Sequence, residues 1–150
     1  MLTRERMRVN GFRFGSIFQV VRWLPAIFWM AFLFYLSHQA APLERVSSNI
    51  DPFFAHVAVY GILAFLLHAA LAGYNRGAPR WVPLSIAFAL AVLYGVSDEF
   101  HQAYVSGRVA SELDLLADAI GAAIGVYLAS LAISRIFARL TTPRFAAKRP

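Results

Sequence analysis

Four long apolar stretches constrain this chain more than any other feature of its sequence. They cover residues 17–36, 53–73, 81–97 and 113–134, and polar segments separate them. A helix rises about 1.5 Å per residue, so roughly 20 apolar residues cross the hydrocarbon core of a bilayer. We therefore predict an all-α membrane protein with four transmembrane helices.

The composition excludes a soluble protein. Hydrophobic residues make up 59% of the chain and charged residues 15%, whereas a soluble domain carries about 25% charge. A length of 150 residues is typical of one domain. The chain contains no cysteine, which excludes disulfides, thiolate metal sites and cysteine nucleophiles.

The basic residues predict the orientation. Twelve of the fourteen lysines and arginines lie at the chain ends or in the 74–80 turn, which share one side of a four-span protein. Seven of the eight acids lie at the opposite side. Because cytoplasmic loops are enriched in lysine and arginine, we expect both termini in the cytoplasm. The predicted parts are a basic cytoplasmic segment 1–16, a four-helix domain 17–134 and a basic cytoplasmic tail 135–150.

This distribution also explains the net charge of +6, so we expect the bilayer as partner and no nucleic acid. Multi-pass insertion in a bacterial cytoplasmic membrane is the predicted localisation. A cleaved signal peptide ending near residues 39–41 is an alternative for the first stretch. That stretch is long and aromatic for a signal peptide, and its Arg22 is close enough to the start to snorkel.

A cluster of polar residues follows the third apolar stretch and enters the fourth. Ionisable side chains beside membrane-length segments are costly unless they are paired or functional. The cluster comprises Asp98, Glu99, His101, Gln102, Arg108, Ser111, Asp114 and Asp118.

Helical spacing brings these residues onto shared faces. Asp114, Asp118, Gly121 and Gly125 lie on one face of the fourth helix, so the acids would point into the bundle. Gly121 and Gly125 form a small-xxx-small pair, which we expect to pack closely against another helix.

Two further helices can contribute to the same pocket. His56 and Tyr60 are four residues apart and share a face of the second helix. Tyr94, Asp98 and His101 share a face if the third helix continues past Ser97. We therefore predict a polar pocket at the outer end of the bundle.

Each of these residues also has a structural interpretation. Ser111 and Asp114 have the spacing of a helix N-cap, and Arg108 can neutralise a neighbouring acid. His56 and Tyr60 can form an interhelical hydrogen bond. Asp118 is harder to explain in this way, because an unpaired acid in mid-helix costs about 3 kcal/mol.

The residue types permit several chemistries. A histidine with carboxylates can act as acid and base or bind a divalent cation. However, the sequence has no HExxH motif or comparable metal spacing, no nucleophile elbow and no glycine-rich phosphate loop. We therefore predict no cofactor and assign no metal ligands. Arg108 is a candidate clamp for a phosphate or carboxylate.

The chain resembles the VanZ-like family of bacterial membrane proteins over about residues 25–130. The residues that carry the resemblance are the run Tyr94 to Gln102, then Gly107, Arg108, Ser111, the run Asp114 to Asp118, Gly121 and Gly125, with Ser37, Pro42, His56 and Tyr60 upstream. Two positions depart from the family pattern. The usual first motif is Asp-Lys-x-x-His, but Asp51 stands one place early and no lysine precedes His56. Asp118 stands where asparagine is common.

The resemblance implies a cell-envelope protein linked to teicoplanin resistance, a form of antibiotic resistance. Our first hypothesis is that its outer pocket binds a polar envelope molecule, such as a lipid head group or glycopeptide. The predicted ligand-binding residues are His56, Tyr60, Asp98, Glu99, Gln102, Arg108, Asp114 and Asp118.

Two alternatives remain open. A membrane enzyme would use acid–base groups on a lipid-linked substrate, with His56, Asp98, Glu99 and Asp114 as candidate catalytic residues. A structural assembly protein would instead dock partner helices on the Gly121 and Gly125 face. The sequence leaves the enzyme question and the oligomeric state open.

Overall fold

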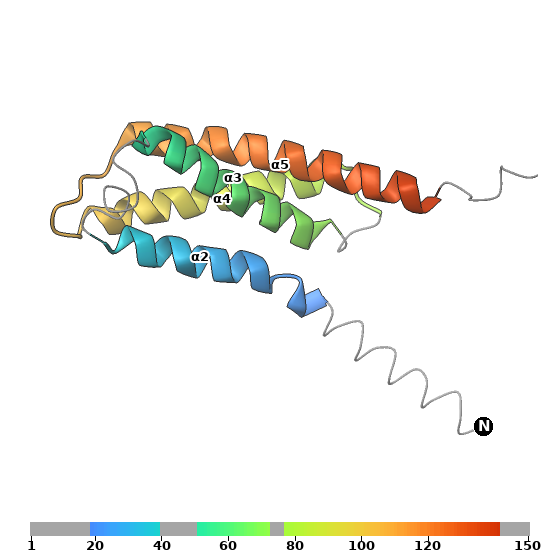
Figure 1. The fold of residues 1–150 in the computed structure, drawn as a ribbon, viewed down its shortest axis with the longest axis horizontal. Helices are drawn as coiled ribbons and strands as arrows, with labels where there is room; N and C mark the ends of the chain where they lie inside the picture. The colour runs from blue at the N-terminus through green and yellow to red at the C-terminus, as the bar shows by residue number, and fades with distance from the viewer. Residues whose placement is uncertain (1–18, 40–50, 73–76, 142–150) are drawn as a thin grey trace, which may run out of the picture.

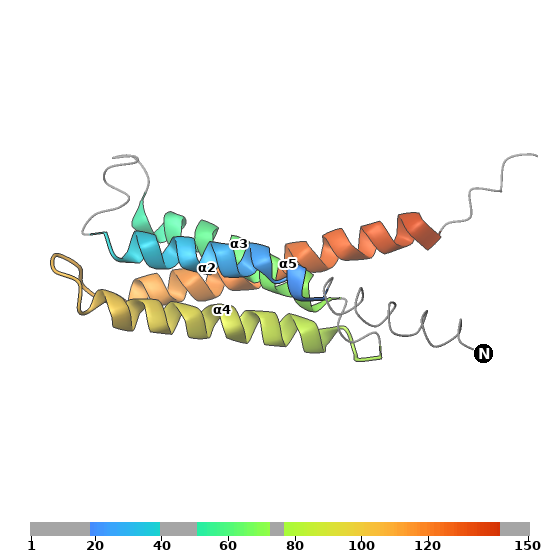
Figure 2. The same ribbon diagram turned by 90° about the horizontal axis from the view of Figure 1, so that it is seen from below.

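A computed structural model describes residues 19–39, 51–72 and 77–141 and forms an antiparallel bundle of four helices (Figures 1 and 2). The helices are α2 (Leu24–Ser37), α3 (Pro52–Leu71), α4 (Trp81–Gln102) and α5 (Glu112–Thr141). No strand occurs in these ranges. The predicted segment 1–16, Pro42 and residues 142–150 of the predicted tail lie outside the described residues.

The predicted four-span, all-α architecture is confirmed. Four helical segments are long and apolar enough to cross a membrane: Gln19–Ser37, Pro52–Leu71, Trp81–Gln102 and Glu112–Ile136.

Two helices are longer than the apolar stretches that predict them. α4 does not end at Ser97 but continues to Gln102, so Asp98 and Glu99 belong to a helix and not to a loop. An apolar run marks only the part of a helix that can face lipid. The backbone hydrogen bonds of α4 continue beyond that part, through the buried residues Asp98 and Glu99. Similarly, α5 does not end at Ser134 and projects beyond its neighbours, because no glycine or proline interrupts residues 126–141 (Figures 1 and 2).

Local signals fix where α3 and α5 begin. Asp51 caps α3 by accepting a 2.9 Å hydrogen bond from the Phe53 amide, and Pro52 suits the first helical position. Gly107 adopts a positive φ of 82° in the turn after α4. Ser111 Oγ then accepts a 3.4 Å hydrogen bond from the Asp114 amide, which is the N-cap interaction that its spacing indicates.

The termini of the helices divide the bundle into two ends. α2 and α4 finish at one end, where α3 and α5 begin (Figure 1, left). We call this the polar end, because it carries Asp98, Glu99, Asp114 and Asp118.

α3 and α5 form the closest helix pair at their glycines. A Cβ atom added to Gly121 would collide with the carbonyl oxygen of Val57, and one added to Gly125 with that of Gly61. The core around this contact is rich in alanine, which also permits close backbone approach. The position of α3 on α5 is therefore tightly determined.

α2 joins the bundle through hydrogen bonds from side chains to backbone carbonyls. Trp29 Nε1 donates to Val59 O at 2.9 Å, and Tyr94 Oη donates to Met30 O at 2.6 Å. Arg22 Nη2 donates to Ala70 O at 3.2 Å near the other end of α2. These bonds hold α2 beside α3 and α4 although few of its own side chains are buried.

The outer surface of the bundle is apolar, as a lipid-facing surface requires. Leu116, Ile120 and Tyr127 of α5 are exposed, on the side of the helix opposite Asp118. Phe28 of α2 and Leu93 of α4 extend this surface around the bundle.

We predict that Gly121→Leu lowers the melting temperature of the purified protein by several degrees. The larger side chain must displace the α3 backbone at Val57, and overpacking of this kind typically costs about 1–3 kcal/mol. Thermal unfolding followed by tryptophan fluorescence measures the change. The matched control is Ala123→Leu on the exposed face of the same helix, which should melt like the wild type. Equal melting of both variants would contradict the close contact.

Candidate functional site

A buried hydrogen bond between a histidine and a carboxylate joins α3 to α5 near the polar end. His56 Nδ1 lies 2.8 Å from Asp118 Oδ1, and Asp118 is fully buried with 0% exposure. His56 is 8% exposed, and its ring stacks on that of Tyr60, one turn further along α3. The mid-helix acid that was hardest to explain from the sequence therefore has a histidine partner.

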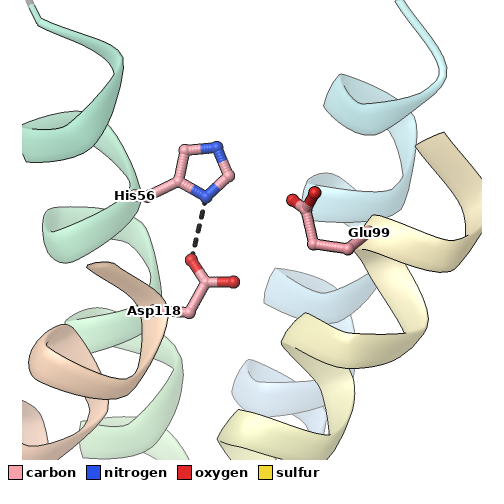
Figure 3. A group of neighbouring side chains, drawn as sticks. All are labelled: His56, Glu99 and Asp118. Atoms are coloured by element: carbon pink, nitrogen blue, oxygen red, sulfur yellow. Dashed lines mark hydrogen bonds and ion pairs between the residues drawn. The ribbon is translucent and has the colours of Figure 1, made fainter. Parts of the chain in front are cut away.

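Glu99 of α4 approaches this pair from the opposite side, as Figure 3 shows. One ligand atom from each of His56, Glu99 and Asp118 can be chosen so that all three lie within 4.8 Å of one another. We call these three residues the buried triad. Each comes from a different helix, so the triad depends on the packing of α3, α4 and α5.

The two oxygens of Glu99 have different surroundings. Oε2 accepts a 2.8 Å hydrogen bond from the Ser111 amide and so ties the 103–111 connection to α4. Oε1 is buried and has no hydrogen-bond partner among the described residues, and the same holds for Asp118 Oδ2. An unpaired buried oxygen of this kind is costly, so both atoms mark a place where a further group can bind.

Gly95 leaves room for the unpaired oxygen of Asp118. A Cβ atom at position 95 would lie 2.6 Å from Asp118 Oδ2 and 3.3 Å from the Asp118 Cβ. A larger residue at this position would therefore displace the carboxylate from the triad.

A small pocket opens beside the triad at the polar end. Its volume is about 50 Å³, and its polar lining consists of Ser37, His56, Tyr60, Asp98, Gln102 and Arg108. These residues come from α2, α3, α4 and the connection before α5, so the pocket lies between elements that are distant in the sequence. It has room for roughly three or four water molecules, or for one small polar group.

Arg108 lines this pocket and has no carboxylate partner in the part of the chain that the structure describes. Among the described residues no acid lies within ion-pair distance of its guanidinium, and its buried Nε has no hydrogen-bond partner. The interpretation in which Arg108 neutralises a neighbouring acid through a direct ion pair therefore finds no contact in the described part of the chain.

Asp98 is held in place by its own helix. Gln102 Nε2 donates a 3.0 Å hydrogen bond to Asp98 Oδ2, and both residues are buried in the pocket wall. The carboxylate thus has a fixed orientation and keeps further acceptor capacity for a ligand.

Asp114 and His101 lie outside both the triad and the pocket lining. Asp114 is half-buried in the first turn of α5, where its amide is capped by Ser111. His101 packs its ring against those of Phe34 and His38 of the α2 end. Gly121 and Gly125 contact α3, as described above, and line neither site.

Three contributions come from residues that were not among the predicted ligand-binding residues. Ser37 enters the pocket lining from the last turn of α2, Gly95 gives Asp118 its space, and the Ser111 backbone binds Glu99. A polar residue at the end of an apolar stretch could have indicated Ser37. The other two depend on helix packing alone.

We predict strong coupling between His56 and Asp118. Replacing either residue by alanine leaves its partner buried and unpaired, whereas the double replacement removes both groups. In a double-mutant cycle, the double variant should lose less unfolding free energy than the sum of both single variants, by roughly 0.5–3 kcal/mol. Unfolding of the solubilised protein provides the measurement. Additive losses would show that the two side chains do not interact.

Comparison with known proteins identifies the family of the chain. No curated protein and no solved structure matches the chain. A family model described as VanZ/LLP1 matches residues 22–134, a range that covers most of each of the four candidate membrane spans and every residue of the triad and pocket. The chain therefore belongs to the VanZ/LLP1 family.

Proposed function

We propose that this protein binds the polar head group of an envelope lipid in the pocket at its polar end. The observation that carries the proposal is the Arg108 guanidinium, which lines the pocket without an ion pair to any described carboxylate. An arginine in this situation is suited to a phosphate, because its planar group donates two parallel hydrogen bonds.

The charges around the pocket favour a head group that also carries hydrogen-bond donors. Asp98 stands in the pocket wall, and the acids of the triad lie close behind it. A ligand with only negative charge would be repelled by these carboxylates. A phosphate with an attached ammonium or hydroxyl group fits both charged residues of the pocket. Arg108 pairs with the phosphate, and Asp98 accepts a hydrogen bond from the ammonium or hydroxyl group.

The size of the pocket supports a small group on a larger molecule. Sites for drug-sized ligands occupy about 300–1,000 Å³, whereas this pocket measures about 50 Å³. A glycopeptide such as teicoplanin is too large to enter it. We therefore attribute the effect on teicoplanin susceptibility that the family resemblance implies to an envelope lipid bound here, not to capture of the antibiotic.

We predict that Arg108→Ala abolishes stabilisation by phosphatidylethanolamine. In nanodiscs of phosphatidylcholine, adding phosphatidylethanolamine should raise the melting temperature of the wild type by several degrees, because a ligand that binds the folded state stabilises it. Phosphatidylcholine provides the same phosphate and net charge without N–H donors, so it serves as the reference lipid.

The matched control is Arg80→Ala, because Arg80 is an exposed arginine at the opposite end of the bundle. This variant should respond to phosphatidylethanolamine as the wild type does. An equal response of wild type and Arg108→Ala would overturn the proposal, since the lipid would then act on the bilayer and not on the pocket.

We also propose that the polar end faces outward, with both termini in the cytoplasm of a bacterial cell. The support is the distribution of lysine and arginine, twelve of which belong to the terminal segments and the 74–80 turn, the parts of the sequence that adjoin the other ends of the helices. In this orientation the pocket meets the outer leaflet.

We predict the outcome of cysteine labelling in intact cells. The native chain has no cysteine, so a single introduced thiol gives an unambiguous signal. Val109→Cys, at an exposed position in the connection before α5, should react with a membrane-impermeant maleimide. Gly77→Cys, in the turn before α4, should react only after permeabilisation. The reverse pattern would show that the pocket faces the cytoplasm.

A further inference from the structure

We propose that His56, Glu99 and Asp118 form a binding site for a divalent transition-metal ion such as Zn²⁺ or Mn²⁺. The three side chains are buried, come from three helices and converge on one space (Figure 3). The inference does not rest on the head-group proposal, because Arg108 is not among the ligands.

The donor set matches the chemistry of these ions. One imidazole nitrogen and two carboxylates bind Zn²⁺ and Mn²⁺ well, whereas Ca²⁺ and Mg²⁺ prefer shells made only of oxygen. Two carboxylates also balance the charge of a divalent cation, so the filled site is neutral inside an apolar bundle.

The geometry needs only a small closure. Ligand atoms about 2.1 Å from the ion lie roughly 3–4 Å from one another, and the ligand atoms of the triad already lie within 4.8 Å. His56 Nδ1 and Asp118 Oδ1 are hydrogen-bonded at 2.8 Å, so a metal ion bound between them would replace the shared proton, which is released to solvent.

The unpaired oxygens provide independent support. Glu99 is 8% exposed and Asp118 is 0% exposed, yet Oε1 of Glu99 and Oδ2 of Asp118 have no hydrogen-bond partner among the described residues. A purely structural pair of His56 and Asp118 would leave the Glu99 oxygen without a role. A bound cation engages both carboxylates at once.

The test uses the purified full-length protein, free of affinity tag and stripped with a chelator. Zn²⁺ or Mn²⁺ alone is then added, with Ca²⁺ for comparison. Metal content after equilibrium dialysis and thermal stability are the two measurements. We expect close to one Zn²⁺ or Mn²⁺ ion per chain, a rise in melting temperature on binding and a weaker response to Ca²⁺.

Glu99→Gln is the decisive variant. Its amide oxygen can still accept the hydrogen bond from Ser111, so the metal-free protein should melt close to the wild type, while metal affinity should fall at least tenfold. Glu112→Gln is the matched control, because Glu112 is an exposed glutamate at the start of α5, and it should bind metal like the wild type.

Arg108→Ala separates this inference from the proposed function. It should lose the lipid response and keep the metal, so each proposal can fail alone. Absence of a bound ion in the wild type, or equal metal binding by Glu99→Gln and wild type, would overturn the metal site.

Discussion

The backbone contact between α3 and α5 determines where the polar groups of this protein can meet. Gly121 lies against Val57, and Gly125 against Gly61, with no side chain in between. His56 directly precedes Val57, and Asp118 lies one helical turn before Gly121, so the same contact brings the histidine and the carboxylate to 2.8 Å. A shift of one residue along this interface would separate the pair and leave two buried groups unsatisfied, which makes the register of α3 on α5 strongly favoured.

Much of the architecture follows from the sequence because a bilayer permits few solutions. An apolar run of sufficient length must become a helix when no water is present to satisfy its backbone, and four such runs give four spans. The helical period likewise places Asp114, Asp118 and the two glycines on one face of α5. These inferences are local, since each depends on a single segment.

The site is less predictable because it depends on contacts between segments. Helical spacing predicts one polar pocket that includes His56, Glu99 and Asp118, but it does not indicate which side chains in that pocket come into contact, since no short motif contains the three residues. Hydropathy places the end of α4 at Ser97, before the first acid, whereas the helix continues to Gln102, the continuation that the shared face of Tyr94, Asp98 and His101 requires. Arg108 could not be assigned from charge alone, since Asp98, Glu99 and Asp114 were available as partners and none of them is within ion-pair distance.

Glu99 links the triad and the pocket to the 103–111 connection. One of its oxygens holds the Ser111 amide, and the other points into the triad, while the connection that it anchors carries Arg108 to the pocket. The head group and the metal ion that we propose would therefore bind on adjacent sides of one rigid element. Asp98 and Glu99 are consecutive in α4 and point about 100° apart, which allows the first to serve the pocket and the second the triad.

The alanine-rich core has a consequence for how this sequence can change over time. Buried positions such as Ala64, Ala87, Ala91 and Ala122 hold the smallest side chain that still favours a helix, so nearly every substitution there adds volume. A larger side chain at these positions forces the helices apart. A smaller side chain, the usual cause of lost stability in a soluble core, can remove only one methyl group here. Mutational drift should therefore be asymmetric, with wide freedom among apolar residues on the lipid-facing surface and almost none along the helix contacts.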